Sequence, residues 1–266
     1  MKKIRLDQLV FDKGLTESRE RAKTSIMSGL VFVNGQRMDK PGTPVDENAV
    51  IELKGDAVPY VSRGGLKLEK ALKVFNFDPS ELVCIDCGAS TGGFTDVLLK
   101  NGAKKVFAVD VGYGQLAWSL RCDARVVNME RTNIRYVTPD ILGEAPDLAV
   151  MDLSFISIRL VLPVVWELIK DGAYVICLIK PQFEAGREKV GKKGVVREKE
   201  THVEVVMSFL DFVPTAGFTA LDLGFSPIRG PEGNIEYLSL LRKGQYQAPA
   251  LDPVAIVEAS HAEFAQ

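Results

Sequence analysis

The sequence has few of the residues that build metal centres and disulfide frameworks. Its 266 residues include two histidines and four cysteines. Cys84 and Cys87 have C-x-x-C spacing, but a zinc site needs a second pair of ligands nearby, and a redox motif needs the pair at the start of a helix rather than at the end of a strand. We therefore expect no metal ion, and thiols that are reduced, inert and mostly buried.

Long apolar runs are scarce as well. The longest, 173–179, has the length of a strand, whereas a membrane-spanning helix needs about 20 apolar residues. Asp7 lies where a signal peptide would have its apolar segment. These features argue against a membrane-spanning or exported protein and predict a cytoplasmic one.

Charge of one sign does not dominate the chain, since 33 basic and 35 acidic residues give a net charge of −2. The distribution is uneven, however. Residues 1–40 hold nine Lys or Arg and five acids, whereas residues 247–266 hold no Lys or Arg. A basic end on a nearly neutral protein favours a local polyanion-binding patch over a general affinity for nucleic acids.

Residues 3–53 show the pattern of a small domain. Apolar residues at helical spacing predict a helix over 4–10, and Ser18 can cap a second helix over 19–28 that stops at Gly29. A short strand with an Asn-Gly turn and a second strand follow. The order R-L-D-x-L, S-R-x-x-A and I-x-x-G-x-V-x-V-N-G closely resembles the S4 RNA-binding domain.

That resemblance implies that the basic end binds RNA. Arg19, Arg21 and Lys23 fall at the start of the second helix, where side chains and free backbone N–H groups can meet phosphates together. Arg5 and Arg63 complete the expected RNA-binding set of this region. A solvated basic helix face is the alternative.

From residue 63 onward, strands and helices are expected to alternate, which implies a parallel sheet and an α/β fold. The predicted strands are 82–86, 105–110, 125–128, 147–152 and 173–179, followed by a closing antiparallel pair, 218–224 and 235–241. The predicted helices are 66–74, 94–101, 115–122, 160–169 and 199–216. The tail from residue 247 is expected to be a loosely held helix.

The most informative segment is the turn after the first of these strands. Residues 84–95 read C-I-D-C-G-A-S-T-G-G-F-T, and Asp110 ends the next strand. Glycines let backbone approach a ligand closely, and an acid at the second strand end can accept hydrogen bonds from a ribose. The turn lacks both the G-x-G-x-x-G of a dinucleotide site and the Gly-Lys-Ser/Thr of a P-loop. It resembles motif I of S-adenosylmethionine-dependent methyltransferases, in the version of the FtsJ/RrmJ-type ribose methyltransferases.

The resemblance implies that S-adenosyl-L-methionine binds across this turn and the next two strand ends. The expected cofactor-binding residues are Gly88, Ala89, Ser90, Thr91, Gly92, Gly93, Phe94, Thr95, Asp110, Val111, Glu130 and Arg131.

Four ionisable residues fall where a substrate above the sheet edge would be reached, namely Lys67, Asp152, Lys180 and Glu236. A ribose 2′-hydroxyl is a poor nucleophile, so its methylation needs a base or stabilisation of the developing alkoxide. A lysine can act as that base when a second cation and partial burial lower its pKa. Asp152 would then orient the two ammonium groups.

The four residues match, one for one, the K-D-K-E tetrad of the FtsJ-like ribose methyltransferases. The strings V-S-R-G-x-x-K-L, D-V-G-Y-G-Q-L, D-L-S-F-I-S, K-P-Q-F-E and G-P-x-G-N-x-E-Y are those of the TlyA family, often labelled haemolysin-like, and the resemblance spans about residues 3–243. It implies an S4 domain (1–54), a linker (55–62), a methyltransferase domain (63–245) and a tail (246–266). The implied fold of the large domain is Rossmann-like class I, with a mostly parallel seven-stranded sheet and an antiparallel last strand.

The same resemblance implies methylation of a 2′-hydroxyl in ribosomal RNA, at a cytidine. Lys180 is the expected general base, supported by Lys67, Asp152 and Glu236, and the expected partner is ribosomal RNA or a ribosomal subunit.

The stretch 186–199 holds six basic residues, two acids and three glycines directly after the Lys180 motif. Its place in the chain favours a loop that closes on substrate RNA, and a flexible solvated loop is the alternative. The expected RNA contacts of this loop are Arg187, Lys189, Lys192 and Lys193.

Three other functions stay open from the residues alone. The string Asp152-Leu153-Ser154-Phe155 occupies the position of the D-P-P-F/Y motif of amino-methyltransferases, although both prolines are missing. The haemolysin-like label suggests a pore-forming protein, but the sequence has neither a membrane span nor an amphipathic lytic helix. A non-catalytic S4 RNA-binding protein is the third possibility, and the intact tetrad argues against it.

Overall fold

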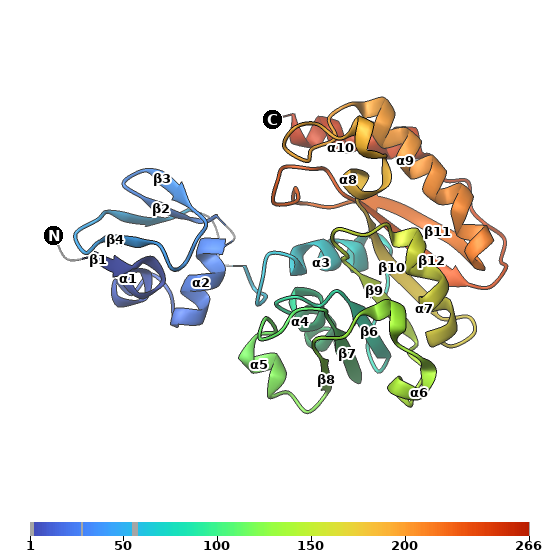
Figure 1. The fold of residues 1–266 in the computed structure, drawn as a ribbon, viewed down its shortest axis with the longest axis horizontal. Coiled ribbons are helices and arrows are strands. Elements are labelled where there is room, and N and C mark those ends of the chain that lie inside the picture. The colour runs from blue at the N-terminus through green and yellow to red at the C-terminus, as the bar shows by residue number, and fades with distance from the viewer. Residues whose placement is uncertain (1–2, 28, 55–57, 266) are drawn as a thin grey trace. The chain divides into compact units, whose positions relative to one another are not determined.

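The computed structural model describes residues 3–27, 29–54 and 58–265. The chain divides into two compact units, Met1–Gly65 and Leu66–Gln266 (Figure 1). Ser28, at the end of the predicted second helix, and residues 55–57 of the predicted linker lie outside the described residues.

The first unit packs two helices with two small sheets. Its elements are β1 (Lys3–Arg5), α1 (Leu6–Asp12), α2 (Arg19–Met27), β2 (Val31–Val33), β3 (Gln36–Met38), β4 (Pro44–Asp46) and β5 (Ile51–Leu53). β1 pairs antiparallel with β4, while β2 lies between β3 and β5. Apolar residues of both helices, including Leu6, Leu9, Ala22 and Ile26, are buried in a shared core.

Both predicted helices of this unit are present, with one difference. The helix expected over 4–10 begins at Leu6, because residues 3–5 pair as a strand with Pro44–Asp46 instead. Ser18 caps α2 as predicted, since its hydroxyl accepts a hydrogen bond from the backbone N–H of Arg21 at 3.2 Å.

The second unit is built on a seven-stranded sheet with the order β11-β12-β10-β9-β6-β7-β8. Its strands are β6 (Val83–Cys87), β7 (Lys105–Val109), β8 (Val126–Met129), β9 (Leu148–Met151), β10 (Tyr174–Ile179), β11 (Phe218–Phe225) and β12 (Tyr237–Lys243). β12 runs antiparallel to both of its neighbours, and the pairs among β6 to β10 are parallel. The predicted Rossmann-like sheet with an antiparallel closing strand is confirmed.

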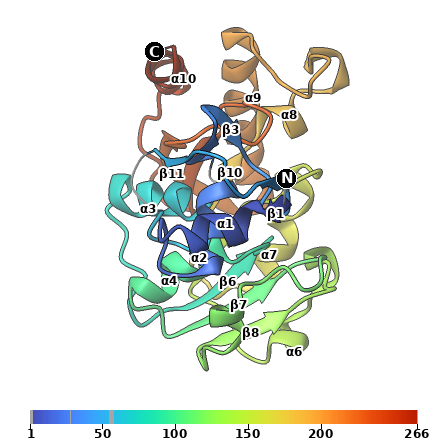
Figure 2. The same ribbon diagram turned by 90° about the vertical axis from the view of Figure 1, so that its left-hand side faces the viewer.

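Helices cover both faces of this sheet. α3 (Gly65–Val74) and α4 (Gly93–Lys100) lie on one side and α7 (Leu162–Leu168) on the other (Figure 2). Sheet residues such as Ile85 and Met151 share one core with α7 and α9. The other helical segments are α5 (Trp118–Arg121), η1 (Ile134–Tyr136), α6 (Pro139–Leu142), η2 (Ile158–Leu160), α8 (Pro181–Glu184), η3 (Arg187–Lys189), α9 (Lys199–Phe212), η4 (Val213–Ala216) and α10 (Pro253–Phe264).

Three helical predictions need correction. The helix expected over 115–122 is the single turn α5, because Gln115 and Ala117 donate their backbone N–H groups to Glu130 and to the Thr91 carbonyl instead. The helix expected over 199–216 ends at Phe212, just before Pro214, and continues as the tighter helix η4. The tail forms α10 but is not loosely held. Val257 and Ser260 are fully buried, and the helix packs on α9 and β11.

Many apolar residues of the second unit are buried in this core. Cys84 and Cys87 are buried in β6, and burial raises the pKa of the Cys84 thiol to about 12. In the part of the chain that the structure describes, no helix combines the length and apolar character needed to cross a membrane.

Candidate active site

The sheet changes its winding direction between β6 and β9. The chain leaves β6 through β7 and β8 and then returns to place β9 on the opposite side of β6. At such a switch point the connections diverge and open a crevice at the carboxyl edge of the strands. Asp86, Asp110 and Asp152 lie at or just beyond the ends of β6, β7 and β9, so three carboxylates meet at this edge.

Glycines shape the turn that follows β6. Gly88 has a φ of +88°, and a Cβ there would come within 3.1 Å of the backbone oxygen of Asp152. A larger residue would therefore push the ends of β6 and β9 apart. Beneath the turn, Asp86 Oδ2 accepts hydrogen bonds from the backbone N–H (3.0 Å) and the hydroxyl (2.7 Å) of Thr95. Asp86 thus ties the strand end to the first turn of α4.

Asp86 is fully buried, and sequence reasoning did not single it out. Burial raises its pKa to about 7, and the charges of Asp152 and Asp110 add to this against the hydrogen bonds from Thr95. Its Oδ1 has no hydrogen-bond partner among the described residues. The available signal was its place in the D-x-G string that opens the glycine turn.

A cavity of about 810 Å³ lies at the same edge, within the size range of small-molecule sites. The Asp110 carboxylate forms part of its wall and accepts hydrogen bonds from the backbone N–H groups of Ser90 (2.8 Å) and Gly112 (2.6 Å). Each carboxylate oxygen keeps a lone pair for a ligand. The cavity is lined by Gly88, Ser90, Val109, Asp110, Val111, Gln115, Thr132, Asn133, Ile134, Arg135, Asp152, Leu153, Ser154, Phe155, Ile156, Ser157 and Leu160.

Only part of the predicted cofactor set lines this cavity, namely Gly88, Ser90, Asp110 and Val111. Glu130 pairs with Arg121 instead, and Arg131 packs 4.0 Å from the centre of the Tyr113 ring. The remaining predicted residues form the turn and the first turn of α4, outside the lining: Ala89, Thr91, Gly92, Gly93, Phe94 and Thr95. Contact of these residues with a cofactor stays a prediction. Sequence reasoning placed Thr132 beside Glu130 and Arg131 at the cofactor, and Thr132 lines the cavity, but it assigned neither 133–135 nor 153–157 to the cofactor site.

The structure brings the four predicted catalytic residues together from separate segments. Lys67 lies on α3, Asp152 and Lys180 directly follow β9 and β10, and Glu236 directly precedes β12. Asp152 Oδ2 is 3.1 Å from Lys67 Nζ, and Asp152 Oδ1 is 2.6 Å from Lys180 Nζ. Glu236 Oε2 is 2.7 Å from Lys67 Nζ. Because Asp152 also lines the cavity, the ion cluster and the cavity share a wall.

The two lysines share Asp152 but differ in their second partner, although each side chain is only 8% exposed. Burial acts to lower the pKa of Lys67, but Asp152 and Glu236 outweigh it, so the pKa is raised and the group stays an ammonium ion. The two lysines likewise outweigh the burial of Asp152 and hold its pKa below the usual value. Lys180 has Asp152 as its carboxylate partner and donates a hydrogen bond to the Ser154 hydroxyl at 3.2 Å.

Two known protein families match this chain. The FtsJ-like methyltransferase family matches residues 60–243, and the S4 domain matches residues 4–51. The chain belongs to the FtsJ-like methyltransferase family. It is a methyltransferase with an S4 domain at its N-terminal end.

Relatives cover nearly the whole chain. It is 51% identical to the "Putative rRNA methyltransferase YqxC" of Bacillus subtilis, across 98% of this chain and 95% of that protein. It is 43% identical to the 16S/23S rRNA (cytidine-2′-O)-methyltransferase TlyA of Mycobacterium tuberculosis, across 91% and 90%. A solved structure, "Putative hemolysin from Streptococcus thermophilus", has 49% identity and a TM-score of 0.79, and covers 100% of this chain and 98% of that one. The resemblance to TlyA and to haemolysin-like proteins is confirmed.

In the methyltransferase domain, the loop 153–157 forms one wall of the cavity. Phe155 has a φ of +63° and is 91% exposed, an unusual combination for a large aromatic residue. Its ring centre lies 5.5 Å from that of Phe183 on α8. Glu184 fixes the end of the loop, because it accepts hydrogen bonds from the Ser157 hydroxyl and the Ile158 N–H, both at 2.8 Å. The carboxylate four residues after Lys180 was the signal that sequence reasoning left unused.

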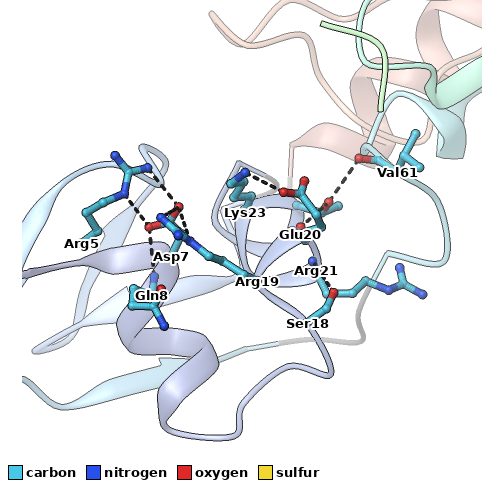
Figure 3. A network of polar contacts seen from close by, with 10 residues as sticks. Arg5, Asp7, Gln8, Ser18, Arg19, Glu20, Arg21, Lys23 and Val61 are labelled. Carbon is cyan, nitrogen blue, oxygen red and sulfur yellow. Dashed lines mark hydrogen bonds and ion pairs between the residues drawn. The ribbon is translucent and has the colours of Figure 1, made fainter. Parts of the chain in front are cut away.

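In the S4 domain, much of the predicted RNA-binding charge is paired (Figure 3). Asp7 is fully buried and accepts hydrogen bonds from both Arg5 (3.0 Å) and Arg19 (3.2 Å). Lys23 pairs with Glu20 at 2.6 Å. Arg21 donates to the Val58 carbonyl at 2.6 Å, a neutral acceptor that leaves its charge in place. The remaining member of the predicted set, Arg63, is half-buried.

The basic loop after Lys180 keeps its predicted charges on the surface. Arg187, Lys189, Lys192 and Lys193 are all exposed. Lys189 pairs with Glu204 of α9, so its charge is partly compensated. Contact of this loop with RNA stays a prediction.

Proposed function

We propose that this methyltransferase transfers a methyl group from S-adenosyl-L-methionine to a ribose 2′-hydroxyl of ribosomal RNA, at a cytidine. The observation that carries the proposal is the position of Asp152. It lines the cavity on one side and pairs with Lys67 and Lys180 on the other, so a small-molecule site lies directly beside a lysine pair. The activity for which the mycobacterial relative is named supports the choice of substrate.

The cavity suits the proposed methyl donor. Its volume of about 810 Å³ accommodates a nucleoside with an amino acid attached. Asp110, held by two backbone N–H groups, has lone pairs for the ribose hydroxyls, and the close backbone approach at Gly88 leaves room for the ligand at the switch point. S-adenosyl-L-methionine, when bound, supplies a methyl group on a cationic sulfur.

We assign to Lys180 the role of general base, which accepts the proton of the 2′-hydroxyl. In its neutral form, Nζ would accept the proton of the 2′-hydroxyl while the ribose oxygen forms its bond to the methyl carbon, and the carbon–sulfur bond would break with its electron pair going to sulfur, which leaves as a neutral thioether. Lys67 is unsuited to this role because two carboxylates keep it charged, whereas Lys180 has one carboxylate and a hydroxyl. Asp152 and Ser154 hold Lys180 Nζ in place, and positioning accounts for much of the expected rate enhancement.

The exposed ring of Phe155 offers a place for the target base. It stands next to Ser154, which contacts Lys180, and it has Phe183 at its side. Aromatic side chains stack on unpaired bases with about 1–3 kcal/mol per base. A base stacked there would bring its own ribose toward Lys180.

The S4 domain is proposed to supply affinity for RNA rather than chemistry. Arg5 and Arg19, which are exposed, and Arg21, which is half-buried, have planar N–H groups that suit phosphate oxygens. Lys23 is expected to contribute less because Glu20 already neutralises it.

The decisive experiment is to map 2′-O-methyl groups on ribosomal RNA from cells with and without this protein. A 2′-O-methyl group protects the adjacent linkage from alkali, whereas a methylated exocyclic amine does not. New alkali-resistant positions that depend on the protein and on Lys180 are expected. Protein-dependent methylation that leaves every linkage alkali-labile would favour the amino-methyltransferase alternative, although Asp152 is already committed to two ammonium groups.

A further inference from the structure

The basic loop displays two of its lysines on a tight turn. Lys192 and Lys193 occupy the central positions of the turn 191–194, which is closed by a hydrogen bond from the Gly194 N–H to the Gly191 carbonyl at 2.8 Å. The Gly191 N–H bonds in turn to the Val195 carbonyl at 3.1 Å. Both lysine side chains are exposed. The turn therefore projects two positive charges from a hydrogen-bonded base.

A buried asparagine forms hydrogen bonds to the backbone at the base of this turn. Asn234 is 2% exposed, and its Oδ1 accepts a hydrogen bond from the Val196 N–H at 3.0 Å while its Nδ2 donates to the Gly194 carbonyl at 2.8 Å. The amide orientation is unambiguous because one partner can only donate and the other can only accept. A carboxylate or a methyl group at this position could not make both bonds.

A buried histidine grips the same segment from the other side. His202 on α9 is 1% exposed, and its Nε2 donates to the Val196 carbonyl at 3.0 Å. Its Nδ1 then accepts from the Tyr237 hydroxyl at 2.7 Å. Behind this pair, Ser260 of α10 lies 3.2 Å from the Tyr237 hydroxyl. Both backbone groups of Val196 are thus held by buried side chains.

The residues that hold the turn are continuous with the ion cluster. Asn234, Glu236 and Tyr237 belong to one short segment, in which Asn234 holds the turn, Glu236 pairs with Lys67, and Tyr237 bonds to His202. The segment is itself fixed, because its Asn234 carbonyl accepts from the Gly230 N–H (2.9 Å) and its Glu236 carbonyl from the Ser226 N–H (2.8 Å). Asn234, Glu236, Tyr237 and His202 thereby connect the lysine turn to the ion cluster and set its position relative to the lysines there.

We propose that Asn234 and His202 are positioning residues that hold the Lys192–Lys193 turn against phosphates next to the target ribose. This inference rests on the proposed function. Exposed ammonium groups suit RNA phosphates, and a turn that is already ordered loses less conformational entropy on binding than a free loop. The two residues act through the lysines and make no contact with the reacting atoms.

The test is a kinetic cycle with full-length protein, ribosomal RNA and S-adenosyl-L-methionine. Asn234→Ala should raise the KM for RNA about fivefold to tenfold, equivalent to one or two lost contacts, with kcat within about twofold and cofactor affinity unchanged. It should also flatten the salt dependence of RNA binding. In a Lys192→Ala/Lys193→Ala background, adding Asn234→Ala should change nothing further.

Thr219→Val is the matched control. Thr219 is also buried, and its hydroxyl also fixes a chain segment, by donating to the Gly244 carbonyl (2.8 Å) and accepting from the Tyr246 N–H (3.0 Å). It lies opposite Arg242 in the sheet, at the edge remote from the ion cluster. Its substitution should leave the KM for RNA unchanged.

Two results would overturn the inference while leaving the proposed function intact. One is a wild-type KM in Asn234→Ala. The other is an effect of Asn234→Ala that is equally large without the two lysines, which would make its role purely structural. If Asn234→Ala does not fold, the Lys192→Ala/Lys193→Ala variant decides, and an unchanged KM there refutes the inference. A wild-type protein that methylates no ribosomal RNA would instead refute the proposed function itself.

Discussion

In each unit of this chain an aspartate lies between two basic side chains, and the two clusters differ in their basic residues and in how deeply these are buried. In the S4 domain, Asp7 lies between Arg5 and Arg19 (Figure 3). In the methyltransferase domain, Asp152 lies between Lys67 and Lys180. The arginine side chains are 55% and 43% exposed, whereas each lysine side chain is 8% exposed.

The chemistry open to each cluster follows from its basic residues. Arginine keeps its proton at any physiological pH, and its exposed N–H groups can grip a phosphate while the aspartate holds the other side of the fork. An amine can be deprotonated far more readily than a guanidinium, and the Asp152 carboxylate that holds Lys180 also lines the cavity. Under the proposed function, we expect the exposed cluster to bind an anion and the buried cluster to move a proton.

The largest expected effect is on the rate of methyl transfer when Lys180 is replaced. Lys180→Ala should keep the fold and lose about 10²–10⁴-fold in single-turnover rate, as is typical when a positioned base is removed. Lys180→Arg should fail similarly, because a guanidinium cannot release its proton near neutral pH. Lys170→Ala, which removes an exposed lysine paired with Asp147, is the control and should retain activity. Wild-type turnover by Lys180→Arg would show that only a fixed positive charge is needed.

The next effect is on stability. Asp152→Asn should lower the free energy of unfolding by about 3–5 kcal/mol, because it leaves buried ammonium groups without their shared carboxylate. Asp7→Asn should cause a smaller loss, since the half-exposed arginines that it frees can turn to water. Urea denaturation of the two variants at pH 7 provides the measurement. Equal losses would mean that the exposure of the basic partners does not distinguish the clusters.

A third aspartate, Asp86, differs from both, because the charged groups that act on its pKa are other carboxylates rather than cations. Its pKa is raised from 3.8 to about 7, so its contribution to stability is complete at low pH and is lost as pH rises from about 4 to about 7. Asp152 has a lowered pKa, so its contribution is present above pH 3.8 and is lost only as pH falls below that value.

Asp86→Asn therefore should gain stability relative to wild type as pH rises from about 4 to about 7 and should change little above that. The slope is at most about 1.4 kcal/mol per pH unit for one proton. Denaturation curves of both proteins across this range measure it. A constant difference between the variant and wild type would show that Asp86 is ionised throughout.

The smallest expected effect is on the salt dependence of RNA binding. Each lost phosphate contact lowers the slope of log affinity against log salt by about 0.7 to 0.9. Arg5→Ala with Arg19→Ala should flatten the slope, whereas Lys23→Ala should change it less because Glu20 already neutralises Lys23. Binding of ribosomal RNA fragments over a salt series measures both. A steeper loss for Lys23 would mean that the Glu20 pair opens on binding.

Sequence reasoning found the features that depend on a short local string or on the residue at the end of a predicted strand. The S4 motif, the glycine turn and the tetrad all follow from short strings at the ends of predicted elements, and the strands were close to their observed bounds. It failed for the cavity wall. Segments 133–135 and 153–157 line the cavity without having been assigned to it, while Glu130 pairs with Arg121. That pairing depends on how two loops meet, which residue spacing cannot reveal.

The residue types at the strand ends could be assigned from the sequence, because continuous apolar runs and turn residues specify the strands and their order along the chain. How those residues are partnered depends on the tertiary structure. It paired Lys67 with two carboxylates and Lys180 with one, left Asp86 buried among acids, and joined the lysine turn to Asn234 and His202. Ion pairing and burial depend on distances of a few ångströms between segments far apart in the chain, and packing alone sets those distances.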